Sequence, residues 1–157
     1  MKKLFSFKDV LFLSLFTLGF SFSLMAQTIT VDQPLYFGRI VVVDFSAVSR
    51  VTILTSGSHT TNSNTHVIDP PARGEYTVSS PANANTVYTI TVPSSTTLAG
   101  PGGGFVLDNI QVRPAVLVTD GVGEDQFELS GRITSTGGGV FYGDGTYDST
   151  FNITFNF

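Results

Sequence analysis

The stretch F-N-I-T-F-N-F, residues 151–157, decides the fold class, because its apolar side chains recur at every second position. Successive side chains of an extended strand point to opposite faces, so a period of two gives one apolar face and one polar face. Here the phenylalanines and the isoleucine share one face, and Asn152, Thr154 and Asn156 share the other. The pattern predicts a β-strand that covers a hydrophobic core with one face.

The same alternation recurs through most of the chain. It is found in Tyr76 and Val78; in Tyr88, Ile90 and Val92; in Val106, Ile110 and Val112, with Asp108 out of step; and in Phe127 and Leu129. After residue 27 the chain is rich in Thr, Val, Ile, Phe and Tyr, and good helix formers are scarce. The sequence therefore predicts an all-β chain.

Clusters of Gly, Pro, Asn and Ser separate the predicted strands and indicate turns. These clusters lie at residues 56–65, 69–74, 79–85, 93–104, 120–125, 137–139 and 143–145. The segments between them predict strands at residues 35–43, 50–55, 75–79, 87–92, 105–113, 126–134 and 147–157. This spacing favours an immunoglobulin-like antiparallel β-sandwich of about seven strands. Because no repeat or change in composition divides the chain, we expect a single β-sandwich domain.

The first 26 residues have the features of a cleavable secretion signal peptide. Three lysines within the first eight residues give a basic start, an apolar run follows at residues 10–22, and Ala26 precedes the predicted cleavage site. The apolar run is shorter than the roughly 20 residues that a membrane-spanning helix needs. We therefore expect export to the periplasm, cell surface or extracellular medium, a mature domain of residues 27–157, and no stable transmembrane segment after cleavage.

The charges of the chain argue against nucleic acid as a partner. The 8 Lys and Arg are outnumbered by 12 Asp and Glu, and every lysine lies within residues 1–26. The basic residues that remain after cleavage are scattered singly, at Arg39, Arg50, Arg73, Arg113 and Arg132. Nucleic-acid binding needs clustered basic side chains that release counterions from phosphates. The chain also has no cysteine, so packing and sheet hydrogen bonds must hold the domain without disulfides.

Several segments occur together in an order that resembles a known family. They are L-Y-F-G-R-I at residues 35–40, G-E-Y-T-V-S at 74–79, Y-T-I-T-V-P at 88–93, F-E-L-S-G-R-I at 127–133 and G-D-G-T-Y-D-S-T-F-N-I-T-F-N-F at 143–157. Their order and spacing resemble the bacterial family called domain of unknown function 4402, over most of residues 27–157. The resemblance implies a small exported β-sandwich related to fimbrial subunits, and it brings no catalytic residues with it.

The residues that could carry chemistry do not form a catalytic pattern. His59 and His66 lie in a polar segment that we interpret as a solvated loop, without the G-x-S-x-G motif of a nucleophile elbow. The glycine-rich run at residues 99–105 lacks the lysine of a phosphate-binding loop, and it predicts a flexible hairpin connection. We therefore expect no enzymatic activity, no cofactor, and no catalytic or metal-binding residues.

Two further groups of residues are compatible with a binding site. Carboxylates near glycines could supply oxygen ligands to calcium, although their spacing does not match an EF-hand; they are Asp120, Glu124, Asp125, Glu128, Asp144 and Asp148. Exposed rings could form a carbohydrate platform, for which Tyr36, Tyr142 and Tyr147 are the candidates. We expect most of the aromatic side chains to belong to the core and the acids to lie in ordinary turns.

Our leading hypothesis for function is an exported structural or adhesive surface protein, such as a pilus- or fimbria-like subunit. It would associate with itself or with other surface subunits through sheet edges, which are templates for strand pairing. Strand donation by the N-terminal segment is the weaker version of this hypothesis. A donated strand needs a long apolar alternation, and here only Ile29 and Val31 alternate before Pro34. A soluble ligand-binding β-sandwich module is the alternative. A small outer-membrane β-barrel is a lesser alternative, since the predicted strands at residues 50–55, 75–79 and 87–92 are shorter than the roughly 9–11 residues that a membrane strand needs.

Overall fold

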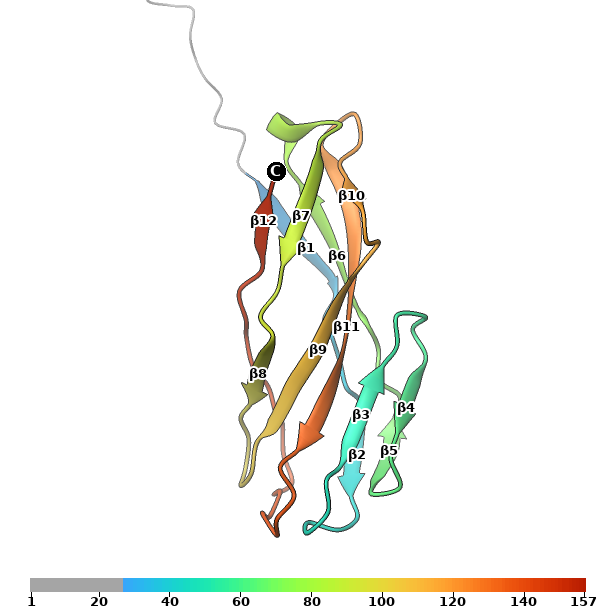
Figure 1. Ribbon diagram of the computed structural model, residues 1–157, viewed down its shortest axis with the longest axis vertical. Coiled ribbons are helices and arrows are strands. Elements are labelled where there is room, and N and C mark those ends of the chain that lie inside the picture. The colour runs from blue at the N-terminus through green and yellow to red at the C-terminus, as the bar shows by residue number, and fades with distance from the viewer. Residues whose placement is uncertain (1–26) are drawn as a thin grey trace, which may run out of the picture.

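The computed structural model describes residues 27–157, and the predicted signal peptide at residues 1–26 lies outside this range. The described chain folds into two layers of antiparallel strands in an elongated β-sandwich (Figure 1). This confirms the predicted all-β fold and its antiparallel sandwich architecture. Within residues 27–157, no helix is long and apolar enough to cross a membrane.

Each of the predicted strand ranges overlaps a strand of the structure, and five further strands lie where none was predicted. The strands are β1 (Thr28–Gln33), β2 (Arg39–Val42), β3 (Arg50–Ile53), β4 (His59–Thr61), β5 (Thr65–Asp69), β6 (Gly74–Ser79), β7 (Val87–Thr91), β8 (Ser95–Leu98), β9 (Phe105–Arg113), β10 (Leu117–Val118), β11 (Glu124–Ser135) and β12 (Thr154–Asn156). A short 3-10 turn, η1 (Pro81–Asn83), follows β6. The additional strands are β1, β4, β5, β8 and β10, so the predicted turns at residues 56–65 and 93–104 each contain a strand.

Strand β11 organises the larger sheet, because its 12 residues are long enough to pair with three neighbours. On one side it pairs first with β6 and then with β3, and on the other side it pairs with β9. β1 extends the sheet beyond β6, β4 extends it beyond β3, and β8 extends it beyond β9. A second sheet has the order β10-β7-β12, and β2 pairs with β5.

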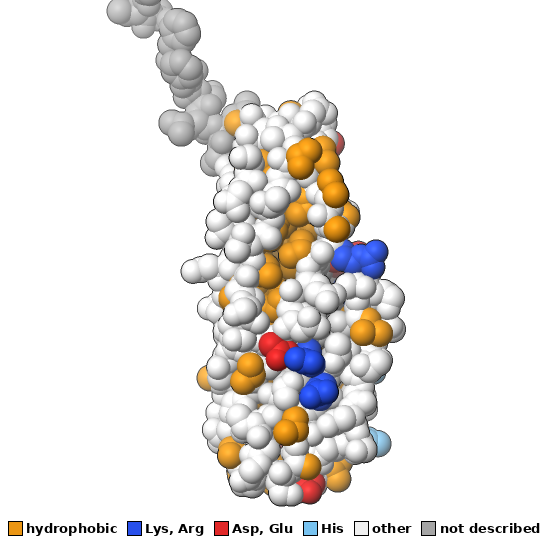
Figure 2. Space-filling view, viewed as in Figure 1, with side chains coloured by type: hydrophobic (Ala, Val, Ile, Leu, Met, Phe, Trp, Pro, Cys, Tyr) orange, Lys and Arg blue, Asp and Glu red, His pale blue; other side chains and the backbone are white. Residues whose placement is uncertain are grey.

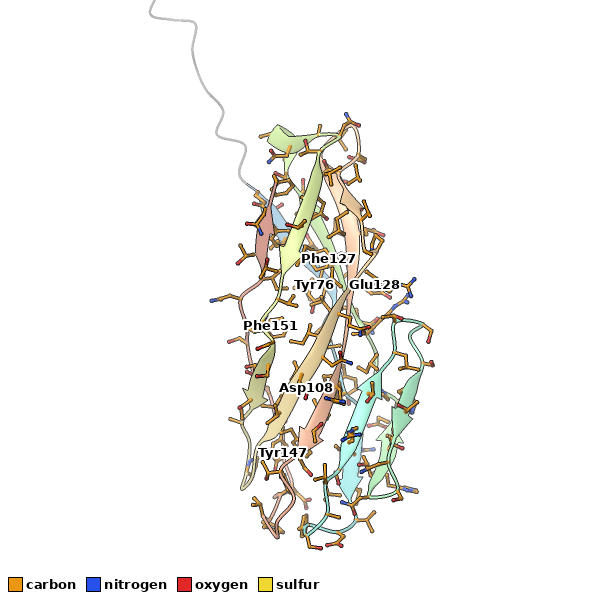
Figure 3. All side chains as sticks on the ribbon, viewed as in Figure 1. Tyr76, Asp108, Phe127, Glu128, Tyr147 and Phe151 are labelled. Atoms are coloured by element: carbon orange, nitrogen blue, oxygen red, sulfur yellow. The ribbon has the colours of Figure 1, made fainter. Side chains whose placement is uncertain are left out.

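Two apolar clusters fill the space between the layers. One consists of Val78, Tyr88, Leu117, Phe127 and Leu129. The other consists of Phe37, Val51, Ile53, Phe105, Leu107, Ile133 and Tyr142. Ile110 and Phe151 pack against both clusters and make the core continuous along the molecule. Figure 3 shows Phe151 about halfway along the sandwich. Phe151, Ile153 and Phe155 face this core as their alternation predicts, but β12 is paired over only three residues.

Candidate functional site

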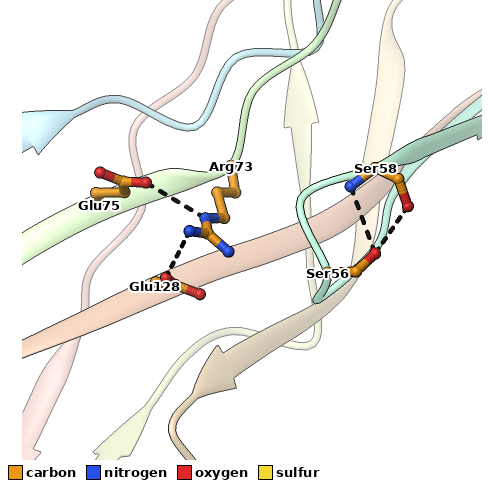
Figure 4. A network of polar contacts seen from close by, with 5 residues as sticks. All are labelled: Ser56, Ser58, Arg73, Glu75 and Glu128. Carbon is orange, nitrogen blue, oxygen red and sulfur yellow. Dashed lines mark hydrogen bonds and ion pairs between the residues drawn. The ribbon is translucent and has the colours of Figure 1, made fainter.

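A polar cleft of about 620 Å³ lies on the outer face of the larger sheet. Arg73 is the centre of its charged residues (Figure 4). Its Nε lies 3.3 Å from Oε1 of Glu75, and its Nη2 lies 2.9 Å from Oε1 of Glu128. These side chains are about a third exposed or more, so each ion pair stabilises the fold by at most about 1 kcal/mol. Asp32, Arg113 and Gln126 also line the cleft, which therefore presents both charges to solvent.

The two histidines lie on strands, which corrects the predicted solvated loop. His59 is the first residue of β4 and His66 lies in β5, and both side chains are exposed. The polar segment forms strands because its threonines pair with apolar neighbours: Thr61 lies opposite Val51, and β5 pairs with β2. In the part of the chain that the structure describes, no group of three or more His, Asp or Glu side chains could hold a metal ion.

The glycine-rich run forms the connection of a hairpin, as predicted, because β8 and β9 pair antiparallel on either side of it. Gly102 has a φ of +87°, and a Cβ atom at this position would lie 2.3 Å from the carbonyl oxygen of Phe141. Glycine is therefore required both by the positive φ and by the close approach of the backbone. The run serves the local fold, and it brings two distant turns into contact.

The acidic residues near Gly121 and Gly123 already have donors within the protein. The Oδ1 atom of Asp120 accepts hydrogen bonds from the N–H groups of Val122 (2.9 Å) and Glu124 (2.8 Å). The Oδ2 atom of Asp125 accepts from the Tyr88 hydroxyl and from the Val118 N–H, both at 3.1 Å. Asp120 therefore holds a turn, as expected for an ordinary acidic turn. The expectation is wrong for Glu124, Asp125 and Glu128, which lie in strand β11.

We expect the protein to lose stability in acid, and we expect Asp120→Asn to weaken that dependence. The backbone N–H groups of Glu124 and Val122 hold the pKa of Asp120 below its usual value. A carboxyl whose pKa is lower in the folded state stabilises the fold at pH values above its unfolded pKa of about 3.9, and this contribution is lost as the pH falls through the folded pKa. Thermal unfolding between about pH 7 and pH 2 measures the effect. Equal acid sensitivity of Asp120→Asn and wild type would contradict the expectation, and the exposed Asp144→Asn serves as the control.

The candidate aromatic platform does not form. Tyr142 is buried between Phe45 and Phe105, at ring-centroid distances of 6.2 Å and 4.9 Å, so it belongs to the core, as expected for most of the aromatic side chains, and is no longer a candidate for an exposed ring. Tyr147 is half-buried, and its hydroxyl donates to the carbonyl oxygens of Pro101 and Gly143. Of the three candidates, only Tyr36 is exposed, at 47%. Tyr142 and Tyr147 therefore close the end of the core instead of forming a binding surface.

The two long sides of the sandwich differ in how their sheet edges are closed. On one side Asp125 of β11 joins the layers, because its carboxylate binds the N–H of Val118 in β10 and the hydroxyl of Tyr88 in β7. The opposite ends of the two sheets are β1 and β12, since β1 is the last strand beyond β6 and β12 is the last strand beyond β7. In Figure 1, β12 lies on the left of the molecule, and β1 begins beside it and runs behind β7 toward the middle. No pairing joins β1 to β12 in the described chain, so this side is open.

Apolar side chains lie along the open edge of β1. Ile29 pairs with Val78 and Val31 pairs with Tyr76, so both share the core-facing side of the sheet. Val78 is fully buried, yet Ile29 and Val31 are 46% and 57% exposed, because no strand among residues 27–157 pairs beyond β1. Exposed apolar residues beside unpaired backbone groups are typical of an association edge. This edge could not be predicted from the sequence, because the position of a strand within a sheet depends on pairing between segments that are distant in the chain.

A second apolar surface lies on the outer face of β7 and β10 (Figure 2). Val87 and Val118 are directly opposite in the strand pair, and both are exposed, as are Val116 and Val122 in the adjoining loops. The backbone edge of β10 beside them is partly closed by Asp125, which binds the Val118 N–H. A partner could therefore contact the apolar side chains of this surface, but it could not pair with a free strand edge there as it could at β1.

Comparison with known proteins agrees with the resemblance found in the sequence. Residues 28–157 match the model of the family described as Domain of unknown function (DUF4402). Neither the curated proteins nor the solved structures contain a match to this chain. The matched segment includes every strand from β1 to β12. The chain therefore belongs to the family Domain of unknown function (DUF4402).

Proposed function

We propose that this protein is an exported structural or adhesive surface protein, of the pilus- or fimbria-like kind, that acts by joining sheet edges. The observation that carries the proposal is the edge of β1, which pairs with no strand on its outer side within residues 27–157 and has Ile29 and Val31 half-exposed beside it. Monomeric β-proteins protect such edges with lysine, proline, bulges or covering segments. From Thr28 to Val31, β1 has no charged residue and no proline, and its bulge lies beyond Val31, next to Pro34.

The other sheet edges support this choice, because they are shorter or covered. The edge of β8 is covered by the chain near Asp148, through a bridge to Ala99 and a contact of 3.2 Å between Thr96 Oγ1 and Ser149 Oγ. Strands β4 and β12 have only three residues each. β1, with 6 residues, is the longest edge strand within residues 27–157. An added strand would therefore gain the most backbone hydrogen bonds at β1.

The pairing of β1 within its own domain favours edge addition over strand donation. A donating arm must be free to enter a neighbouring subunit, whereas Thr28–Gln33 pairs with β6 of the same chain. Release of this arm would break that pairing and expose Val78, which is fully buried. A strand added beside β1 requires no such unfolding. The proposed subunit therefore assembles with its sandwich intact.

The alternative function is a soluble ligand-binding module, and the polar cleft around Arg73 is the observation that favours it. The cleft combines two arginines with Asp32, Glu75 and Glu128, and it could hold a polar ligand that carries both donors and acceptors. Such a module would work as a monomer. The state of assembly therefore separates the two candidates.

The proposal is tested by expressing the full chain in an exporting bacterial host and determining its location and assembly. We expect protein that is accessible to protease on intact cells and that a carboxyl-directed dihydrazide cross-linker converts into dimers or larger assemblies. Amine-directed reagents are unsuitable, because every lysine lies within residues 1–26. The cytoplasmic enzymes of the same cells provide the control for lysis. Protein that stays inside the cell, or that remains monomeric on the cell and in concentrated solution, would rule out an assembly subunit.

A further inference from the structure

We propose that β1 pairs with β1 of a second copy of the chain, antiparallel and about a two-fold axis at Thr30. The larger sheets of the two copies would then form one continuous sheet. This inference rests on the proposed function and names the partner that the open edge accepts. A two-fold contact requires a surface that is complementary to itself, and the residues of β1 meet that condition.

The sequence of β1 fixes the register of the pair. With Thr30 opposite Thr30, Ile29 of each copy lies opposite Val31 of the other, and all of these apolar side chains lie on the core-facing side. Asp32 is the residue at the bulge and is paired with no residue of β6, and it would lie near Thr28 of the other copy on the outer face. A shift of the axis to Val31 would place Ile29 opposite Gln33, beyond the bulge that interrupts β1 after Val31. The register at Thr30 therefore pairs every apolar residue of the strand with another apolar residue.

The charges of β1 are compatible with this arrangement. Asp32 is the one charged residue of the strand, and its Oδ2 atom accepts a hydrogen bond from Thr77 Oγ1 at 2.7 Å on the outer face. In the proposed register the two Asp32 residues are four positions apart along the strands, which corresponds to about 14 Å. This separation exceeds the Debye length of about 8 Å at physiological ionic strength, so their repulsion is largely screened.

A second copy explains the open edge better than a loose peptide would. The edge is already held rigidly by β6, so pairing orders no unfolded segment and has a small entropic cost. The same exposed pair, Ile29 and Val31, is covered in both copies by one contact. Because only a few residues are buried, the dimer would be weak in dilute solution and favoured at the high local concentration of a cell surface.

A single introduced cysteine tests the pairing, because the chain has none of its own. Residues directly opposite in an antiparallel pair have Cα atoms about 4.5–5.5 Å apart, which lies within the range that a disulfide bridges. We expect Thr30→Cys to form a disulfide-linked dimer about tenfold faster under mild oxidation than Thr61→Cys, which lies on the exposed edge strand β4. Thr28→Cys and Asp32→Cys should cross-link efficiently only when the two variants are mixed.

A charged residue on the core-facing side provides a second test. Val31→Lys, in the Thr30→Cys background, should slow dimer formation by about tenfold, because the lysine would be placed against Ile29 of the other copy. Val43→Lys in the same background should leave the rate unchanged, since Val43 is 65% exposed and lies outside β1. Circular dichroism of each variant confirms that the sandwich is folded.

The outcomes separate this inference from the proposed function. Equal cross-linking of Thr30→Cys and Thr61→Cys, or the fastest cross-linking at Thr28 or Asp32 alone, would overturn the two-fold pairing. If the wild type still assembles on the cell in that case, the proposed function stands and another edge makes the contact. If the wild type is monomeric on the cell and in concentrated solution, both the pairing and the proposed function fail.

Discussion

Replacement of Phe127 by alanine is expected to lower the free energy of unfolding by about 3–5 kcal/mol. Phe127 lies in β11 and is 1% exposed. Its ring stacks on Tyr76 at a centroid distance of 5.1 Å and meets the edge of Phe155 at 5.7 Å. The substitution would leave a cavity between the two sheets, because these neighbours are held by their own strands. A domain of this size has a total stability of about 5–15 kcal/mol, so the loss is a large part of the whole.

Chemical denaturation monitored by far-ultraviolet circular dichroism measures this loss. Phe141→Ala is the matched control, because Phe141 is 64% exposed and its replacement should change the stability by less than about 1 kcal/mol. Equal effects of the two substitutions would show that Phe127 does not lie in the core. A loss confined to Phe127→Ala would support the packing of β11 against β12.

Replacement of Asn64 by alanine is expected to cost about 2–3 kcal/mol, the second-largest effect. The Asn64 side chain accepts a hydrogen bond from the Asp44 N–H at 2.8 Å, and its Nδ2 donates to the carbonyl oxygens of Asp44 and Ala47 and to Ser49 Oγ. It therefore holds the turn between β2 and β3 against the start of β5. Alanine would leave several of these polar groups without a partner in a mostly buried position.

Thermal and chemical unfolding of Asn64→Ala, compared with Asn152→Ala, tests this role. Asn152 is exposed on the polar face of the C-terminal segment, so its replacement should be nearly neutral. A neutral Asn64→Ala would mean that water replaces the side chain at no cost. In that case the turn would be held by its backbone hydrogen bonds alone, such as that from Val43 N–H to the Asn64 carbonyl.

The strands with apolar alternation could be predicted from the sequence because their side chains alone show which face is buried. Residues 105–113 were predicted as a strand and form β9 with the same bounds. Strand β8, with the sequence S-T-T-L, has no such signal, because it pairs at an edge and buries little. Residues 147–153 show the apolar alternation of a strand but are not part of a strand in the structure. Phe151 and Ile153 pack on the core, and the strand pairing of β12 begins only at Thr154.

The candidate sites depended on contacts between distant residues, which the sequence does not display. Arg73 and Glu128 are far apart in the chain and meet because β6 pairs with β11. Tyr142 was expected to be a possible surface ring, but its hydroxyl binds the Thr136 N–H at 2.9 Å and its ring lies in the core. Likewise, Ile29 and Val31 are visible as alternating residues, but only the strand order places them on an open edge.

Hydrogen exchange of the β1 amides tests the central claim that this protein acts through an open sheet edge. The amides of Thr28–Gln33 that point away from β6 should exchange rapidly in dilute protein and become protected as the concentration rises. The amides of β4, an edge strand of only three residues, should show no such change. Exchange at β1 that is independent of concentration, or protection that appears at β4 instead, would contradict the account.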